Sequence, residues 1–131
     1  MEFLKEIIKE GRRKFLGYIE GETLKFLEEL LKTDLGVQTK ERRRRPFVAW
    51  YDFNTLKVVF LTQTNKKKHV NLKLCEKYNP ECNWIKENSY VFQDRKRGYA
   101  GYSFKEPVFD YVYCGECKDL DFLEELNFYT F

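Results

Sequence analysis

Two apolar runs separated by a short polar turn constrain the fold of this 131-residue chain more than any other feature. Residues 47–51 (FVAWY) and 56–61 (LKVVFL) are rich in β-branched and aromatic side chains, and residues 52–55 (DFNT) between them are typical of a turn. Such a pattern predicts a β-hairpin. Basic residues precede the first run and follow the second, so the hairpin would carry positive charge at its open ends.

The rest of the chain adds helices and short strands. Helical spacing of apolar residues predicts one helix within residues 2–16 and another over 22–32. Asp119 is a candidate N-cap for a short helix near the C-terminus. Further strands are expected over residues 69–72, 89–92 and 108–113, the last from a period-two alternation.

These elements predict a mainly β fold of the α+β class, with about five or six short strands and helices at both ends. A small, half-open barrel of the SH3-like type is the expected architecture. We expect residues 1–36 to form an N-terminal helical segment and residues 37–131 to form the barrel domain with a short C-terminal helix. The N-terminal helices would either cover one edge of the barrel or serve as an arm for a partner, since an amphipathic helix buries its apolar side.

Composition narrows the class of protein. Hydrophobic residues make up 43% of the chain, which allows a real core. No apolar run approaches the roughly 20 residues that span a bilayer, so we expect a soluble, cytoplasmic protein with no membrane partner. Charged residues reach 34%, and the abundance of Lys and Glu is typical of a thermophile source.

The net charge of +3 does not by itself indicate nucleic acid, but the basic residues are clustered. Clustered Lys and Arg neutralise phosphate charge, and aromatic side chains can stack on unpaired bases. The candidate nucleic-acid-binding residues are Arg42, Arg43, Arg44, Lys66, Lys67, Lys68, Arg95 and Arg97. The candidate stacking residues are Trp50, Tyr51, Tyr90, Tyr99 and Tyr102. The alternative is that the charges are solvated turns and the aromatic residues belong to the core.

Three residue types near the hairpin suit metal-free cleavage of RNA, which needs a base, a cation for the developing charge and an acid. Arg45, before the rigid Pro46, offers a planar, permanently charged fork for phosphate oxygens. Thr62 or Thr64 could donate a hydrogen bond to a phosphate oxygen. His69, the only histidine, is the acid–base candidate. The alternative for Thr62 and His69 is an ordinary place in a strand.

Four short motifs follow one another in a recognisable order. They are an Arg-Pro step that opens an apolar strand (residues 45–48, RPFV), a second apolar strand ending in threonine (58–62, VVFLT), a further strand (69–72, HVNL) and a serine-led strand after a polar residue (87–91, ENSYV). Over roughly residues 44–100 the chain thereby resembles the PemK/MazF-like toxins, which cleave RNA. The resemblance implies an SH3-like barrel, activity on RNA and catalytic positions at Arg45 and Thr62. It also implies an antitoxin partner.

The four cysteines are Cys75, Cys82, Cys114 and Cys117. Cys114 and Cys117 form a C-x2-C motif, which in a turn presents two thiolates from one backbone. Zinc prefers four tetrahedral thiolate or imidazole ligands, so a closed structural zinc site is one prediction. One or two disulfides, or free thiols, are the alternatives. No cofactor is expected to be required for the chemistry itself.

Three functions are consistent with these features. The first is a metal-independent endoribonuclease of a toxin–antitoxin pair, acting on single-stranded RNA. The second is a non-catalytic nucleic-acid-binding module on the same barrel, stapled by zinc or disulfides. The third is a protein-interaction domain whose acidic helices and aromatic surface bind another chain or a second copy.

Overall fold

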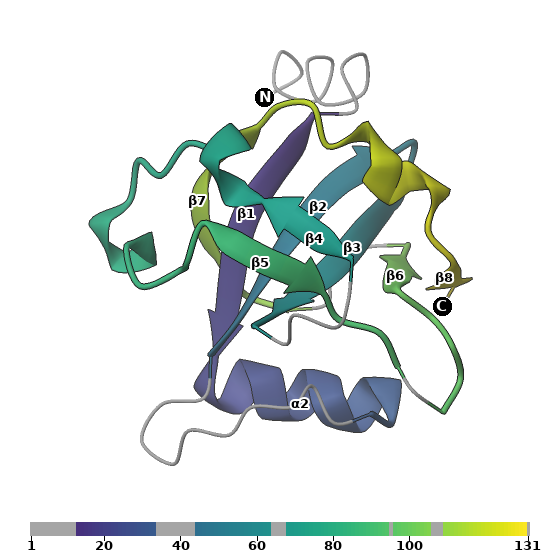
Figure 1. The fold of residues 1–131 in the computed structure, drawn as a ribbon. Helices are drawn as coiled ribbons and strands as arrows, with labels where there is room; N and C mark the ends of the chain where they lie inside the picture. The colour runs from purple at the N-terminus through teal and green to yellow at the C-terminus, as the bar shows by residue number, and fades with distance from the viewer. Residues whose placement is uncertain (1–12, 34–43, 64–67, 95, 106–108, 131) are drawn as a thin grey trace.

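The computed structural model describes residues 13–33, 44–63, 68–94, 96–105 and 109–130, and their strands form one curled sheet (Figure 1). The sheet runs in the order β4 (His69–Asn71), β5 (Asn88–Val91), β3 (Thr55–Thr62), β2 (Arg44–Asp52), β1 (Lys14–Glu20) and β7 (Val112–Cys117). Beside this path, β6 (Gly101–Phe104) pairs with β3 and, in parallel, with β8 (Phe128–Thr130). The helical elements are α2 (Gly21–Leu31) and the 3-10 turns η1 (Leu72–Leu74), η2 (Pro80–Cys82) and η3 (Asp121–Glu125). The described part is therefore mainly β, a half-barrel with one α-helix.

The central hairpin confirms the prediction from the two apolar runs. Strands β2 and β3 pair antiparallel from Phe47 opposite Phe60 to Asp52 opposite Thr55. Phe53 in the connecting turn has a φ of 57° and is 79% exposed, so this aromatic side chain takes no part in the core. The hairpin forms because both of its strands are apolar on two faces and the residues between them are polar.

Strands β1, β2 and β3 are buried on both faces, so their sequences read as continuous apolar runs. One cluster of side chains fills the inside of the curl and includes Leu16 and Val48. Their neighbours Phe15 and Phe47 point to the opposite face, where they pack with Phe60 in a second cluster. This alternation follows the period of two that a strand imposes on its side chains.

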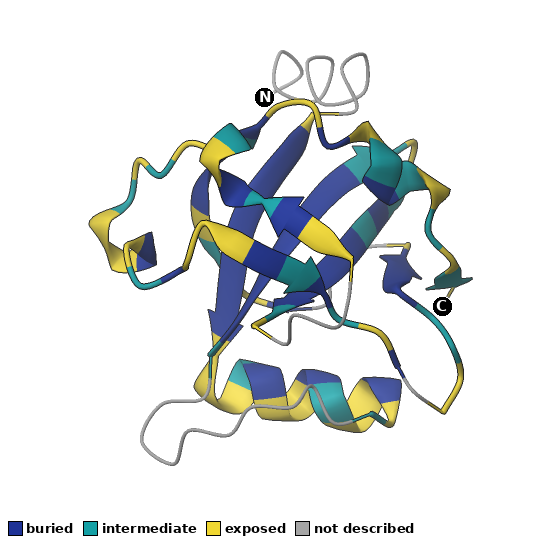
Figure 2. Cartoon of the chain, in the orientation of Figure 1, coloured by how far each residue is buried: buried dark blue, intermediate teal, exposed yellow. Residues whose placement is uncertain are grey.

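The helix α2 covers part of the second cluster and confirms the helix predicted over residues 22–32. Leu24, Leu27 and Leu31 are buried against the strands. Phe26, on the other side of the helix, is 50% exposed. Figure 2 shows this division as a helix with a buried side toward the sheet and an exposed side away from it. Within the described ranges, no helix is long and apolar enough to cross a membrane.

Three sequence predictions are wrong for residues that the structure describes. Lys14–Glu20 forms β1, although helical spacing predicts a helix through residue 16. Residues 109–111 precede β7, which begins at Val112 and not at residue 108. The short helix predicted after Asp119 is the 3-10 helix η3, and the residue at its N-cap is Leu120, not Asp119. Burial on two faces explains the first error, because it removes the alternation that distinguishes a strand from a helix.

A seam joins the two outer edges of the curled sheet. The segment after η1 runs beside β7, and three backbone hydrogen bonds of 2.8 to 2.9 Å connect them, donated by Glu76, Tyr78 and Lys118 to the carbonyls of Glu116, Cys114 and Leu74. A Cβ atom at Gly115 would lie 1.8 Å from the carbonyl oxygen of Glu76. Only glycine therefore allows the two edges to approach this closely.

Two disulfides cross the same seam and correct the zinc prediction. Cys75 is bonded to Cys117, and Cys82 is bonded to Cys114. The C-x2-C motif lies in a strand and not in a turn, so its two α-carbons are separated by about 10 Å and its sulfurs reach different partners. No cluster of three metal-ligating side chains occurs in the described part of the chain. The alternative of two disulfides is confirmed.

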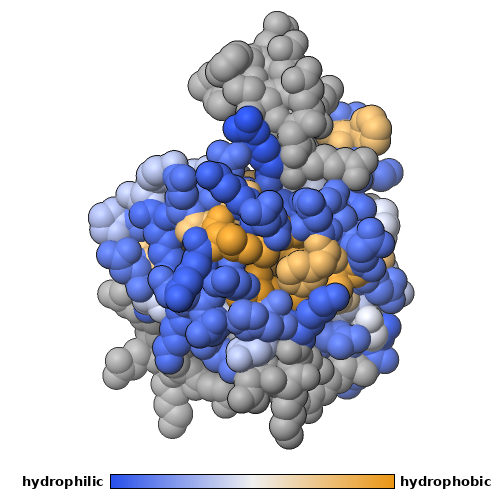
Figure 3. All heavy atoms as spheres, turned by 45° about the horizontal axis from the view of Figure 1, so that its top comes forward, coloured by the Kyte–Doolittle hydropathy of each residue, from blue (hydrophilic) through white to orange (hydrophobic). Residues whose placement is uncertain are grey.

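One end of the barrel, which carries η1 and η3, is closed by partly buried apolar side chains. Leu74, Phe122 and Leu126 pack there against the inner cluster. Figure 3 brings this end forward and shows apolar surface framed by hydrophilic residues. The buried Lys14 fastens η3 to β1, because its Nζ lies 3.2 Å from Oε2 of Glu124.

Candidate functional site

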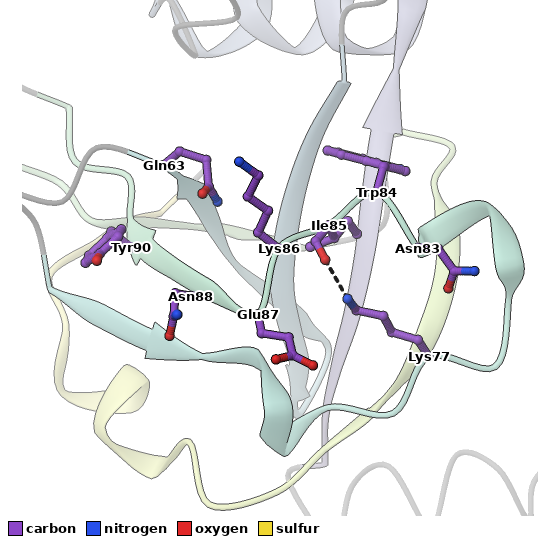
Figure 4. Close-up of a pocket in the computed structure, with 9 residues that line it drawn as sticks. All are labelled: Gln63, Lys77, Asn83, Trp84, Ile85, Lys86, Glu87, Asn88 and Tyr90. Atoms are coloured by element: carbon purple, nitrogen blue, oxygen red, sulfur yellow. Dashed lines mark hydrogen bonds between the residues drawn. The ribbon is translucent and has the colours of Figure 1, made fainter.

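A hollow of about 570 Å³ lies beside β5, between that strand and the segment that leads into it (Figure 4). It is lined by Gln63, Lys77, Asn83, Trp84, Ile85, Lys86, Glu87, Asn88 and Tyr90. Most of these residues belong to the stretch 77–90, which begins between the disulfide-bonded Cys75 and Cys82. Within that stretch, Nζ of Lys77 donates to the carbonyl of Ile85 at 2.5 Å. The seam and this bond therefore support one wall of the hollow.

Trp84 contacts two other side chains that hold it in place. The guanidinium carbon of Arg44 lies 4.3 Å from the centroid of the Trp84 ring. Tyr18 packs edge-on against the same ring, with 5.3 Å between centroids. Arginine favours such stacking because its planar cation is attracted to the face of an indole. A ring that is already ordered can contact a ligand without a further loss of side-chain entropy.

The charges around the hollow favour an anion. Lys77 and Lys86 line it, Arg44 lies on Trp84, and Glu87 contributes a carboxylate. Glu87 is 4.0 Å from Nζ of Lys73, but both side chains are more than half exposed, so this ion pair is weak. In Figure 4 the amine of Lys86 extends toward Gln63, away from the Lys77 side of the hollow. The hollow suits a ligand that combines negative charge with a flat ring.

Two of the three predicted catalytic residues share a face with Tyr90. Thr62 lies opposite Tyr90 in the β3–β5 pair, and His69 lies opposite Tyr90 in the β4–β5 pair. Residues directly opposite in a ladder point to the same face, so Thr62, Tyr90 and His69 form one row. Thr62 and His69 are two strand spacings apart, roughly 10 Å, and they flank Tyr90 instead of meeting at one point. Nε2 of the exposed His69 is 3.0 Å from Oδ1 of Asn88.

Arg45, the third predicted catalytic residue, is buried. Its side chain is 7% exposed, and its Nη1 donates to the carbonyl of Leu61 at 2.7 Å. The guanidinium carbon also lies 5.6 Å from the centroid of Phe92. In this conformation Arg45 connects β2 to β3, and a phosphate would reach it only after a rearrangement.

The predicted phosphate contacts are distributed over several places. Arg42, Arg43, Lys66, Lys67 and Arg95 lie outside the described residues. Arg44 is at the hollow, stacked on Trp84. Lys68 is exposed at the end of the barrel, where its Nζ lies 4.9 Å from the centroid of Phe122.

Arg97, the remaining predicted phosphate contact, is engaged within the protein. Its Nε donates to Oδ2 of Asp94 at 3.0 Å, and its Nη2 donates to the carbonyls of Leu31 and Lys32 at the end of α2. Burial by itself would raise the pKa of Asp94, but the backbone N–H groups of Arg97 and Lys96 and the Arg97 guanidinium hold that pKa below its ordinary value of 3.8. The Asp94–Arg97 ion pair lies within the connection between β5 and β6, and the bonds from Nη2 of Arg97 join that connection to the end of α2.

Of the predicted stacking residues, Tyr90 lines the hollow and the others do not. Trp50 and Tyr102 are 1% and 2% exposed and belong to the two core clusters. Burial raises the pKa of Tyr102 to about 12. Tyr51 packs against the second cluster, which contains Phe15 and Phe47, and Tyr99 packs against Tyr129 of β8. The core alternative is therefore correct for Trp50 and Tyr102.

Sequence reasoning missed Gln63, Trp84, Lys86 and Asn88 as residues of one site. A signal was present, because Trp84-Ile85-Lys86 interleaves an aromatic and a basic residue, as surfaces that bind single strands do. The runs of arginine and lysine elsewhere were more conspicuous. Gln63 had no local signal, since only the fold brings the end of β3 to this hollow.

A scan against protein-family models found no match, and searches of curated proteins and of solved structures found none either.

Proposed function

We propose that the protein binds single-stranded RNA, with the hollow beside β5 as the contact surface. The observation that carries the proposal is the Arg44–Trp84 stack next to Lys86 and Tyr90. Unpaired bases stack on fixed aromatic rings, and adjacent cations hold the phosphates. Bases would lie on Trp84 and Tyr90, and phosphates toward Arg44 and Lys86. The resemblance to PemK/MazF-like toxins supports RNA as the nucleic acid.

The salt dependence of RNA binding tests this proposal. Fluorescence anisotropy would give the affinity for a labelled single-stranded RNA over a series of salt concentrations. Removing one phosphate contact with Lys86→Ala should lower the slope of log affinity against log salt by about 0.7. Lys25→Ala removes an equivalent exposed charge from α2 and should leave the slope unchanged. An absence of RNA affinity at low salt would refute the proposal and leave the protein-interaction function as the remaining candidate.

The stacking contribution has its own test. Tyr90→Ala should weaken RNA binding by about 1–3 kcal/mol at every salt concentration, because stacking is independent of charge. Phe53→Ala, which removes an exposed ring from the hairpin turn, is the matched control and should not change the affinity. Equal losses for both variants would show that RNA does not use the hollow.

RNA cleavage is a second candidate function, supported by the row of Thr62, Tyr90 and His69 and by the resemblance, which implies catalysis at Arg45 and Thr62. His69 would act as the acid or base, since its imidazole is exposed and can both accept and donate a proton. The test is a cleavage assay on a long single-stranded RNA with EDTA present. Wild type should cut at defined positions, and His69→Ala and Arg45→Ala should bind without cutting. No cleavage by wild type would leave a binding module without catalytic activity.

An antitoxin or a second copy as partner, and a cytoplasmic location, remain predictions. Disulfides are typical of oxidising compartments, and intracellular proteins of hyperthermophiles are the exception. With two disulfides, a cytoplasmic location is consistent only with the predicted thermophile source. Alkylation of free thiols at the moment of cell lysis would show whether the cysteines are disulfide-bonded in the cell or only after it is opened, because cysteines that are already disulfide-bonded would stay unmodified.

A further inference from the structure

We infer that RNA binding by the hollow is under redox control, through the disulfide between Cys82 and Cys114. The inference rests on the proposed RNA binding and names a regulation of that same site. The closed disulfide holds the wall of the hollow that carries Trp84 and Lys86, and its reduction to two thiols releases that wall.

This wall has few connections to the sheet. In Figure 1 the connection from β4 to β5, which contains the wall, extends to the side of the sheet. The backbone-to-backbone hydrogen bonds of residues 79–86 among the described residues close turns inside this segment. Cys82 donates to Asn79 at 2.9 Å, and Ile85 donates to Cys82 at 3.1 Å. The disulfide from Cys82 to Cys114 of β7 is therefore the covalent link between the segment and the sheet.

Side-chain contacts alone hold the wall less firmly. Ile85 is buried in the inner cluster, and Trp84 contacts Tyr18 and Arg44. Such contacts can break one at a time as the segment moves, whereas the disulfide fixes the chain two positions before Trp84. A site whose wall is in place for part of the time binds with an affinity reduced by that fraction.

The other disulfide differs in this respect, although it crosses the same seam. The residues on either side of Cys75 take part in the backbone hydrogen bonds of the seam. Leu74 accepts from Lys118 at 2.9 Å, and Glu76 donates to Glu116 at 2.9 Å. These bonds keep Cys75 beside β7 when its disulfide is open. The bond at Cys75 therefore stabilises the protein without controlling the hollow.

The reaction that opens the wall is an exchange with a dithiol. One thiolate of the dithiol attacks a sulfur of the Cys82–Cys114 bond and forms a mixed disulfide, and its second thiol then displaces the protein. Two electrons and two protons have passed to the protein, which holds two thiols, and the dithiol has become a disulfide. Cys82 and Cys114 are 0% exposed, against 7% and 6% for Cys75 and Cys117, so we expect Cys75–Cys117 to be reduced first. RNA binding is then confined to oxidising conditions.

The test compares two variants that each lack one disulfide. Anisotropy with a labelled single-stranded RNA at low salt should give Cys82→Ala/Cys114→Ala an affinity at least about fivefold below that of oxidised wild type. Cys75→Ala/Cys117→Ala is the matched control and should bind within about twofold of wild type, because its wall stays in place. The two loops are of similar length, so both variants should lose similar stability. Hydrogen exchange should be faster over residues 79–86 in the first variant alone and unchanged over β2 and β3 in both.

A dithiol titration of the wild type tests the redox step itself. Alkylation and mass spectrometry would count each open disulfide, and circular dichroism would monitor the fold at every point. RNA affinity should fall with the opening of Cys82–Cys114 and stay unchanged while only Cys75–Cys117 is open.

The outcomes separate this inference from the proposed function. Wild-type affinity in Cys82→Ala/Cys114→Ala would overturn the redox control and leave RNA binding in place. Equal losses of affinity in both variants would overturn it as well, because lower stability would then be the cause. No binding by oxidised wild type at low salt would refute the proposed function and this inference with it. If the first variant does not fold, Cys82→Ala/Cys114→Val, which keeps more of the buried volume, replaces it.

Discussion

Removing the two seam disulfides should destabilise the barrel by more than the sum of the single effects. The loop closed by Cys75–Cys117 spans 42 positions and contains the loop of 32 positions closed by Cys82–Cys114. By the chain-entropy argument, each bond alone would stabilise the protein by restricting its unfolded chain, by about 3.9 and 3.7 kcal/mol respectively. With Cys82–Cys114 already closed, Cys75–Cys117 adds a ring of only about 10 residues, worth about 2.7 kcal/mol.

These values fix the expected pattern of losses. Replacing either pair of cysteines by alanine should lower the free energy of unfolding by about 2.5–3 kcal/mol, because the other disulfide still restricts the unfolded chain. Replacing both pairs should lower it by about 6.4 kcal/mol, which exceeds the sum of the single losses by about 1 kcal/mol. That loss is comparable with the whole stability of a domain of this size, about 5–15 kcal/mol. The protein without disulfides should therefore be marginally folded at 25 °C.

Guanidinium chloride unfolding of the wild type, the two paired variants and the fourfold variant would measure these losses. Reduction of the wild type with a phosphine is an independent route to the same state, without the small cavities that alanine leaves. Full stability after reduction would refute the reasoning, because the core and the backbone seam would then suffice. Single losses that add up to the fourfold loss would refute the nested arrangement of the loops.

Gly115→Ala should lower the free energy of unfolding by about 2–4 kcal/mol, because the added Cβ would clash with the Glu76 carbonyl and separate the seam. In the control variant Gly101→Ala the added Cβ meets only the Phe128 ring, so the loss should be smaller. Equal losses of the two variants in denaturant unfolding would contradict this geometry. The pKa of Asp94 is lowered from 3.8 in the folded protein, so its carboxylate stabilises the fold above that pH and loses this effect as the pH falls through the folded pKa. The stability gap between wild type and Asp94→Asn should accordingly be constant near about pH 6 and shrink below about pH 4, and a gap that does not change with pH would argue against the ion pair with Arg97. Lys14→Met should cost about 1–2 kcal/mol by removing the ammonium next to Glu124, and an unchanged unfolding midpoint would show that this contact contributes nothing.

The elements that could be predicted are those whose evidence is local. The β2–β3 hairpin joins two adjacent apolar runs through a short turn, so pattern and turn chemistry are sufficient to place it. The helix α2 shows its stripe of Leu24, Leu27 and Leu31 within 11 residues. Each of these elements buries the face that its own sequence marks as apolar.

The elements that were misread depend on distant partners. β1 is a strand because β2 and β7 pair with it on either side. Both partners lie far along the chain, so the local sequence around β1 does not indicate them. β7 begins at Val112 because its pairing with β1 begins there, opposite Tyr18. The C-x2-C motif takes the conformation of that strand, so its cysteines became partners of Cys75 and Cys82 instead of ligands of a metal.

By itself, the sequence determined the hairpin, the helix, the presence of four cysteines and the mixture of basic and aromatic residues, because these depend on side chains a few positions apart. The tertiary structure decided which cysteines pair and which side chains line the hollow. It brought Gln63 from the end of β3 to Trp84 and Asn88, and it placed Arg45 and Arg97 in internal bonds. Those outcomes depend on the registers between strands and on how the sheet curls, and periodicity within one segment carries no information about either.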